Sequence, residues 1–276
     1  MPSWLPQDPD DGPLMEPDAQ IRSILSRMVV LIPAFNEEAS LPGLLEELAE
    51  HLPACPVCVV DDGSSDRTVA VARAAGVRVL RMPHNCGVGL AVQTGFIDAI
   101  ERGYDYLLRI DADGQHPPAE AIKLIRQMAR EPTDLVIGTR YGEGSAYTGT
   151  PFRRFVLWFL ARFVSLICRR PSTDPTSGFW LVARPLMLCF ALHYPSDYPE
   201  PEALALMRRQ GFSFDEVPVM FRPRLAGASS LGIWGTINFA AKVFLALFVD
   251  RLRPVSRHGS AAFIKGRSAP CCAKLS

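Results

Sequence analysis

Short apolar runs alternate along this chain with amphipathic segments, and that alternation limits the fold more than any other feature. Buried strands are predicted for runs rich in Val, Ile and Leu over residues 28–33, 57–60, 77–81, 106–110 and 135–138. Helices are predicted where apolar residues recur at helical spacing, over residues 41–52, 66–75, 88–102 and 119–130. Ser40 is the expected N-cap of the first helix. This order predicts an α/β fold with a largely parallel sheet.

Polar residues and glycines follow the first four predicted strands. They are Asn36 and Glu38, Asp61 and Asp62, Asn85 and Gly87, and Asp111 and Asp113. Open α/β sheets bind ligands at the carboxyl ends of their strands. The sequence therefore predicts one ligand site that these loops share.

Asp111 and Asp113 are the most informative of these residues. Two carboxylates at positions i and i+2 after a strand can point to one side and chelate a hard divalent ion. The alternative is an ordinary turn whose aspartates cap the next helix. Asn85-x-Gly87-x-Gly89 resembles a dinucleotide loop, but it follows the third strand and has Val92 at the third glycine position. We interpret it as a turn that allows close approach of a nucleotide or sugar.

Composition excludes several classes of protein. Lys and Arg number 29, as do Asp and Glu, and the pI is near 7.0, so bulk charge excludes a basic nucleic-acid binder. Residues 1–20 are acidic and residues 250–276 are basic, and both ends predict flexible tails. The seven cysteines lack disulfide spacing, Cys55 and Cys58 lie in the run ACPVCVVDD and are expected to be core residues, and no secretory signal is found at the start of the sequence. A reduced, cytoplasmic chain is expected.

Six motifs together resemble glycosyltransferase family 2, in order and spacing, over about residues 28–230. They are IPAFNEE (32–38), VVDDGSSDRT (59–68), NCGVGLA (85–91), RIDADGQHPP (109–118), GTRY (138–141) and TSGF (176–179). DADGQHP and EVPVMFRPRLAGASS (216–230) are most similar to the dolichyl- and polyprenyl-phosphate sugar synthases. The resemblance implies a GT-A fold with a single Rossmann-like sheet, an inverting mechanism, a UDP- or GDP-sugar donor, and Mg²⁺ or Mn²⁺.

The resemblance also implies roles for individual residues. The nucleoside pocket would be lined by Pro33, Ala34, Asn36 and Glu38, with Asp61 and Asp62 reading the base or ribose. The metal-binding positions are Asp111, Asp113 and Gln115. Phosphate or acceptor groups would be bound by Arg140, Arg224 and Ser229, and Ser177 and Gly178 would also bind substrate.

Two positions depart from the lipid-phosphate enzymes. Ser230 stands where they usually have Lys, and Trp180 follows TSGF in place of Arg. A phosphate acceptor is already ionised at neutral pH, whereas a sugar hydroxyl needs a general base. Glu200 and Glu202 are the nearest candidates for that base, although both would also suit the first turn of a helix.

Two apolar helices bear on where the protein acts. Residues 155–168 are too few to span a bilayer, and Lys242 lies near the centre of the longer run at 233–249. Each could be a core helix, but Trp158, Trp234 and the flanking arginines favour helices lying in the membrane interface.

The predicted organisation has four parts. An acidic tail covers 1–27, and a glycosyltransferase domain covers 28–230, with a nucleotide-sugar half at 28–145 and an acceptor half at 146–230. A membrane-interface helix at 231–253 and a basic tail at 254–276 follow.

The predicted activity is transfer of a sugar to a polyprenyl phosphate by an enzyme bound peripherally to the inner face of the cytoplasmic membrane. The rivals are transfer to a glycan hydroxyl in surface polysaccharide assembly and, in another class, a catalytically silent module that binds a nucleotide sugar. The oligomeric state stays open, a homo-oligomer included.

Overall fold

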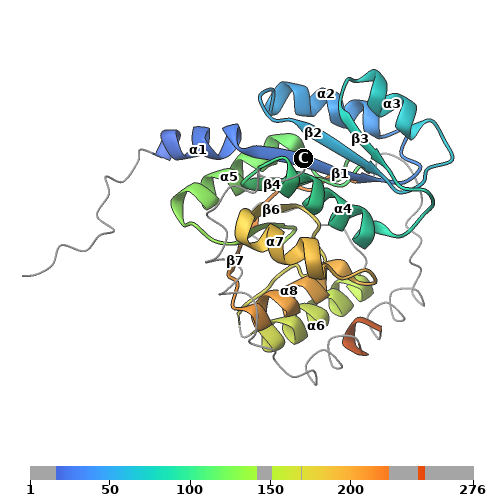
Figure 1. Cartoon of the computed structure of the whole chain (residues 1–276). Coiled ribbons are helices and arrows are strands. Elements are labelled where there is room, and N and C mark those ends of the chain that lie inside the picture. Colours follow the sequence, from blue (N-terminus) through green and yellow to red (C-terminus); the bar gives the residue numbers. More distant parts are fainter. Residues whose placement is uncertain (1–16, 142–150, 169, 224–241, 246–276) are drawn as a thin grey trace, which may run out of the picture.

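Seven strands form one sheet, in the order β3-β2-β1-β4-β6-β5-β7. The computed structural model describes residues 17–141, 151–168, 170–223 and 242–245 (Figure 1). The strands are β1 (Met28–Ala34), β2 (Val57–Asp61), β3 (Arg78–Arg81), β4 (Tyr106–Arg109), β5 (Leu135–Thr139), β6 (Trp180–Ala183) and β7 (Phe214–Pro218). Strands β1 to β5 confirm the five strand predictions, and each of these strands begins and ends within one residue of its predicted position.

Helices cover both faces of the sheet (Figure 1). They are α1 (Pro17–Ser26), α2 (Leu41–His51), α3 (Thr68–Ala74), α4 (Val88–Glu101), the 3₁₀ turn η1 (Pro118–Glu120), α5 (Ala121–Arg130), α6 (Pro151–Cys168), α7 (Arg184–His193) and α8 (Pro199–Gln210). Residues of α1, α2, α3 and α5 belong to one apolar cluster, and residues of α4, α6, α7 and α8 belong to the other. Successive side chains of β1 alternate between the two, since Leu31 joins one and Ile32 the other.

The predicted, largely parallel sheet is confirmed, with one antiparallel strand that the sequence did not reveal. β1 runs parallel to β2 and β4, β2 to β3, and β5 to β7. β6 runs antiparallel to both β4 and β5. No turn signal marks its end, because α7 begins at Arg184, directly after Ala183. Its pairing with β4 sets Trp180 opposite Arg109, which brings TSGF beside the DAD motif.

Two local predictions need correction. We expected a flexible tail over residues 1–27, but residues 17–26 form α1, where Ile24 is buried and Ile21 and Leu25 pack against the core at helical spacing. Residues 1–16 and 246–276 lie outside the described ranges. Ser40 occupies the N-cap position of α2, but its hydroxyl does not cap the helix because it donates to the Glu37 carboxylate instead.

Gly89 allows the segment before α8 to pass directly over α4. A Cβ at this position would lie 2.5 Å from the carbonyl oxygen of Pro195 and 2.7 Å from the Cα of Ser196. These are backbone atoms, which cannot swing aside as the end of a side chain can. The close approach brings the first turn of α8 to the carboxyl end of the sheet.

Gly89→Ala should lower the free energy of unfolding by about 1–3 kcal/mol, because the new methyl group overpacks this contact. Gly43→Ala is the matched control in α2, where a Cβ meets nothing within 4 Å. That change should raise stability by about 0.8–1 kcal/mol through helix propensity. Urea unfolding of both variants checks the pair, and equal stability of the two would contradict the close approach.

Candidate active site

A cavity of about 580 Å³ lies at the carboxyl ends of β1, β2 and β4. Eight residues that the sequence singled out line it: Pro33, Ala34, Asp62, Asn85, Gly87, Asp111, Asp113 and Glu200. A larger cavity, of about 820 Å³, surrounds the amino ends of β1, β2 and β3 and is lined mainly by apolar residues, with none of the predicted site residues. Because the predicted site residues line the smaller cavity and not the larger one, we place the candidate site there.

The turn that carries Asp111 and Asp113 is held by local hydrogen bonds. The backbone N–H of Asp111 donates to Nδ1 of His116 at 3.0 Å, and Oδ1 of Asp113 accepts the N–H of Gln115 at 3.1 Å. His116 is buried and stacks on Phe179, with 5.0 Å between ring centroids. Burial lowers the pKa of His116 to about 4, so the ring is neutral at pH 7. With Nδ1 accepting, its proton lies on Nε2.

Arg109 ends β4 with a guanidinium that is only 2% exposed. Its Nε and Nη2 both lie 3.1 Å from Oδ1 of Asp111, and Nη2 lies 2.9 Å from Oε1 of Glu200. Nη1 donates to the hydroxyl of Tyr194 at 3.2 Å, and the group packs 5.8 Å from the Trp180 ring. One buried cation therefore joins two carboxylates at the cavity wall.

These contacts shift the pKa values of both carboxyl groups. Burial is the largest single influence and raises the pKa of Asp111, but the charge and hydrogen bond of Arg109, together with His116 and Arg140, outweigh it and the net shift is downward. For Glu200 burial dominates, and its pKa is raised although Arg109 opposes the shift. Asp111 is thus held ionised, as a metal ligand must be.

Asp61 is the last residue of β2 and Asp62 directly follows it, and the two carboxylates have different contacts. The carboxylate of Asp62 accepts the N–H groups of Cys86 and Gly87, at 2.7 and 2.8 Å, and so holds the NCG turn against the cavity. Asp61 is fully buried, and its Oδ2 accepts the N–H of Ser64. Its Oδ1 has no hydrogen-bond partner among the residues that the structure describes.

Asn36 and Glu38 do not line the cavity. Oδ1 of Asn36 accepts the N–H of Ser65 at 2.9 Å, and Oε2 of Glu38 accepts the N–H of Arg67 at 3.0 Å. Both side chains tie the loop after β1 to the loop after β2. Their printed contacts therefore hold together the two loops beside the cavity and do not form its lining.

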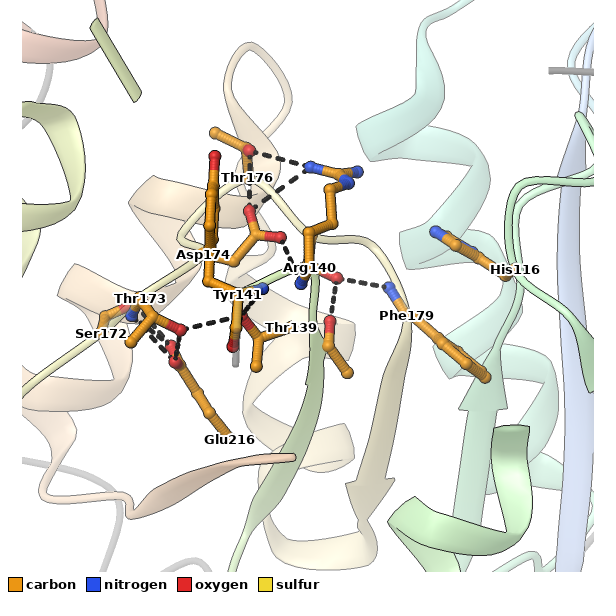
Figure 2. Close-up of polar contacts among 12 residues, drawn as sticks. His116, Thr139, Arg140, Tyr141, Ser172, Thr173, Asp174, Thr176, Phe179 and Glu216 are labelled. Atoms are coloured by element: carbon orange, nitrogen blue, oxygen red, sulfur yellow. Dashed lines mark hydrogen bonds and ion pairs between the residues drawn. The ribbon is translucent and has the colours of Figure 1, made fainter. Parts of the chain in front are cut away.

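Arg140 does not line the cavity, and its polar contacts are shown in Figure 2. Its N–H donates to Oδ2 of the buried Asp174 at 3.1 Å, and Nη1 lies 3.4 Å from Oδ1. The guanidinium packs 4.6 Å from the centre of the Phe221 ring. Glu216 of β7 anchors the same loop by accepting the N–H of Thr173 and the hydroxyl of Ser172.

Ser177 and Gly178 shape the site from the segment that leads into β6. The hydroxyl of Ser177 donates to the carbonyl of Gly138. A Cβ at Gly178 would lie 2.8 Å from Oδ2 of Asp111 and 2.9 Å from Nη2 of Arg109. Only a glycine leaves room for that ion pair.

The remaining predicted residues lie elsewhere. Glu202 is absent from the cavity lining, and its Oε1 accepts the N–H of Tyr198 at the start of α8. Gln115 also lies outside the lining, and its carbonyl accepts the N–H of Arg222. Arg224 and Ser229 fall outside the described residues.

Sequence reasoning missed Arg109, Phe35 and Glu37, which all line the cavity. A signal existed for Arg109, because it is the one charged residue in the apolar run YLLRI. Its partners Glu200 and Tyr194 lie far along the chain, so their convergence on it was not visible.

The donor set fits Mg²⁺ or Mn²⁺ at Asp111 and Asp113. Carboxylate oxygens suit hard divalent ions, and Mg²⁺ commonly takes one or two carboxylates while substrate phosphates supply further ligands. Within the described ranges, no three His, Cys, Asp or Glu side chains gather into a complete metal site. The two carboxylates therefore suit an ion that arrives with a phosphorylated ligand.

Comparisons with known proteins agree with this arrangement. The sequence profile of Glycosyl transferase family 2 matches residues 29–187. The chain is 32% identical to a polyprenol monophosphomannose synthase of Mycolicibacterium smegmatis, over 74% of this chain and 81% of that protein. It is 37% identical to an undecaprenyl-phosphate mannosyltransferase of Micrococcus luteus, over 55% of this chain and 65% of that protein.

A solved structure shares the fold. Glucosyl-3-phosphoglycerate synthase from Mycobacterium tuberculosis, crystallised with Mn²⁺, UDP-glucose and phosphoglyceric acid, matches with a TM-score of 0.67 at 20% identity. The match covers 93% of this chain and 87% of that chain. The predicted GT-A fold is confirmed.

Arg109→Met should lower the free energy of unfolding by about 3–5 kcal/mol, because two partly buried carboxylates lose their shared cation. Arg27→Met is the control: Arg27 lies 2.8 Å from Asp105, but its side chain is 51% exposed. That change should cost about 0–1 kcal/mol. Urea unfolding measures both, and a loss at Arg109 as small as that at Arg27 would contradict the central place of this guanidinium.

Proposed function

The chain belongs to glycosyltransferase family 2, and we propose that it transfers a sugar from UDP or GDP to a polyprenyl phosphate. The observation that carries the proposal is the meeting of Asp111, Asp113 and Asp62 in one cavity at the carboxyl ends of parallel strands. The names of the two relatives, a polyprenol monophosphomannose synthase and an undecaprenyl-phosphate mannosyltransferase, support a polyprenyl phosphate acceptor here.

The donor would lie along the cavity from Asp62 to Asp113. Asp61 is fully buried and does not line the cavity, but its Oδ1 has no hydrogen-bond partner in the described part of the chain and would suit an N–H or O–H donor of the base or ribose. Asp111 and Asp113 would hold Mg²⁺ or Mn²⁺, which offsets the negative charge of the departing diphosphate when bound. Asn36 and Glu38 keep the two loops of this pocket together.

The acceptor phosphate needs positive charge more than it needs a base. A phosphate oxygen is ionised at neutral pH, so it can attack the anomeric carbon as the bond from that carbon to the diphosphate oxygen breaks, with inversion. Arg140 is the candidate partner for the acceptor phosphate. Asp174 and Phe221 hold its guanidinium, and its charge is close enough to help lower the pKa of Asp111. The predicted roles of Arg224 and Ser229 remain proposals.

A glycan hydroxyl is the second candidate acceptor, and the position of Glu200 favours it. Glu200 lines the cavity that holds Asp111 and Asp113, and burial raises its pKa, which is the direction that suits a general base. Transfer to a hydroxyl would use this carboxylate, whereas transfer to a phosphate would not.

We also propose that α6 and the segment at 242–245 rest on the cytoplasmic face of the membrane. Leu166 and Leu245 are 74% and 63% exposed, Trp158 is 56% exposed, and Arg162 packs 5.8 Å from the Trp158 ring. Exposed apolar groups beside arginines suit an anionic membrane interface. No helix in the described ranges is long and apolar enough to cross a bilayer.

One detail refines the predicted interfacial surface. The ring centres of Phe159 and Phe163 of α6 lie 5.3 and 4.5 Å from that of Phe244; Phe163 packs against the core, and Phe159 is 52% exposed, less than Leu166 and Leu245. Leu166 and Leu245 are therefore the better probes of a membrane contact.

The test of function is an assay of the full chain with UDP- and GDP-sugars, Mn²⁺ and polyprenyl phosphate. Wild type should form a sugar–lipid product, and Asp113→Asn should lower kcat by roughly 10²-fold or more, since it removes a ligand charge with little change in volume. Near-normal turnover of Asp113→Asn at saturating Mn²⁺ would contradict the metal assignment.

The acceptor is decided in the same assay by adding a water-soluble oligosaccharide. Glycosylation of the oligosaccharide alone would replace the lipid phosphate with the hydroxyl acceptor. Donor binding without any turnover would instead favour the silent binding module.

Replacing both Leu166 and Leu245 with Asp should reduce binding to anionic vesicles by about tenfold or more, because each leucine loses the free energy of apolar burial. Ile97→Asp is the control, since it places a charge at an exposed apolar position on α4. Sedimentation with vesicles measures the bound fraction. Equal binding by both variants and wild type would contradict the proposed surface.

A further inference from the structure

Glu200 is the least explained charged group in the cavity. It stands in the first turn of α8 between Pro199 and Pro201, which are both buried. Proline fixes φ, so this turn holds Glu200 with little backbone freedom. The side chain is 18% exposed and lines the cavity with Asp113.

Arg109 sets the distance between Glu200 and the metal-binding carboxylates. Its Nη2 contacts both Oδ1 of Asp111, at 3.1 Å, and Oε1 of Glu200, at 2.9 Å. Glu200 is therefore one guanidinium group away from Asp111. If a diphosphate and its ion occupy Asp111 and Asp113, the next part of the donor along the cavity is the sugar.

Neutralising Arg109 does not explain why Glu200 is there. Asp111 already supplies one negative charge to the guanidinium, and the hydroxyl of Tyr194 meets Nη1. Adding Glu200 leaves the trio of Asp111, Arg109 and Glu200 with an excess negative charge. A partly buried carboxylate in that position is costly unless a ligand donates hydrogen bonds to it.

We propose that Glu200, positioned by Arg109, accepts hydrogen bonds from ring hydroxyls of the transferred sugar and selects which sugar is used. The inference rests on the proposed function and adds the specificity-determining residue to it. Hexoses such as glucose, galactose and mannose differ in the orientation of their ring hydroxyl groups. A site built to bond a hydroxyl discriminates strongly against a sugar that lacks it or presents it differently.

The experiment is calorimetry on the full chain with Mn²⁺, comparing Glu200→Gln with wild type. The ligands are UDP, GDP, UDP-glucose, UDP-galactose and GDP-mannose. Glu200→Gln should weaken binding of the preferred sugar nucleotide by about 10- to 100-fold, which is the effect of losing a hydrogen bond to a charged group. Binding of the bare nucleoside diphosphate should change by less than about twofold, because it carries no sugar.

Deoxy analogues of the preferred donor identify the hydroxyl. Removing the hydroxyl that Glu200 reads should weaken binding to wild type but not to Glu200→Gln, which is the coupling that a double-mutant cycle measures. Glu200→Asp keeps the charge with a shorter reach, and it should alter the order of preference among the sugars. It also keeps the test available if Glu200→Gln folds poorly.

Tyr194→Phe is the matched control, since it removes another Arg109 contact without altering a residue that lines the cavity. It should leave the preference between sugars unchanged. The inference is overturned if Glu200→Gln weakens the bare diphosphate as much as the sugar nucleotide, or if both Glu200 variants keep the wild-type preference. If the wild-type protein binds none of these nucleotides, the proposed function itself is contradicted. That outcome differs from a wild type that binds them while the Glu200 variants keep its sugar preference.

Discussion

A single buried guanidinium organises the site. Arg109 lies at the end of β4, and its charge holds Asp111 on one side and Glu200 on the other. Gly178 leaves space for the pair, and Trp180 packs against it from the neighbouring strand. Without this cation, the two carboxylates would face each other in a partly dehydrated cavity, where one of them would have to take up a proton. Arg109 keeps Asp111 ionised and ready to meet a metal ion.

The sheet explains how distant parts of the sequence reach this cation. β1, β2 and β4 are parallel neighbours, so the loops after them emerge at one edge. β6 pairs with β4 in the opposite direction and delivers Ser177 and Gly178 to the same place. The close approach at Gly89 then brings α8, with Glu200, over the opening. The hydrogen bonds of Asp62, Asn36 and Glu38 hold the surrounding loops, so much of the cavity wall is organised before any ligand binds.

The sequence was sufficient to predict the first five strands and most of the residues that line the cavity. Parallel strands place their carboxyl ends at the same edge of a sheet, so the loops that follow them lie together. It could not show where each side chain points. Asn36 and Glu38 lie in the predicted loop after β1, but their side chains contact the loop after β2. Glu200 and Glu202 are two residues apart in one helical turn, so they project in different directions, and only the docking of α8 decides which reaches the cavity. β6 was not predicted because it is short and continues directly into α7. α1 was not predicted because its few apolar residues lie in a Pro- and Asp-rich segment.

The central claim is that Asp111 and Asp113 form an incomplete metal site that a nucleoside diphosphate completes. The most direct measurement is the affinity of the protein for Mn²⁺, determined by electron paramagnetic resonance with and without UDP or GDP. Two carboxylates alone should bind Mn²⁺ weakly, and one of the diphosphates should strengthen binding markedly because its phosphate oxygens supply further ligands. Mn²⁺ affinity that is the same with and without both nucleotides would contradict the account.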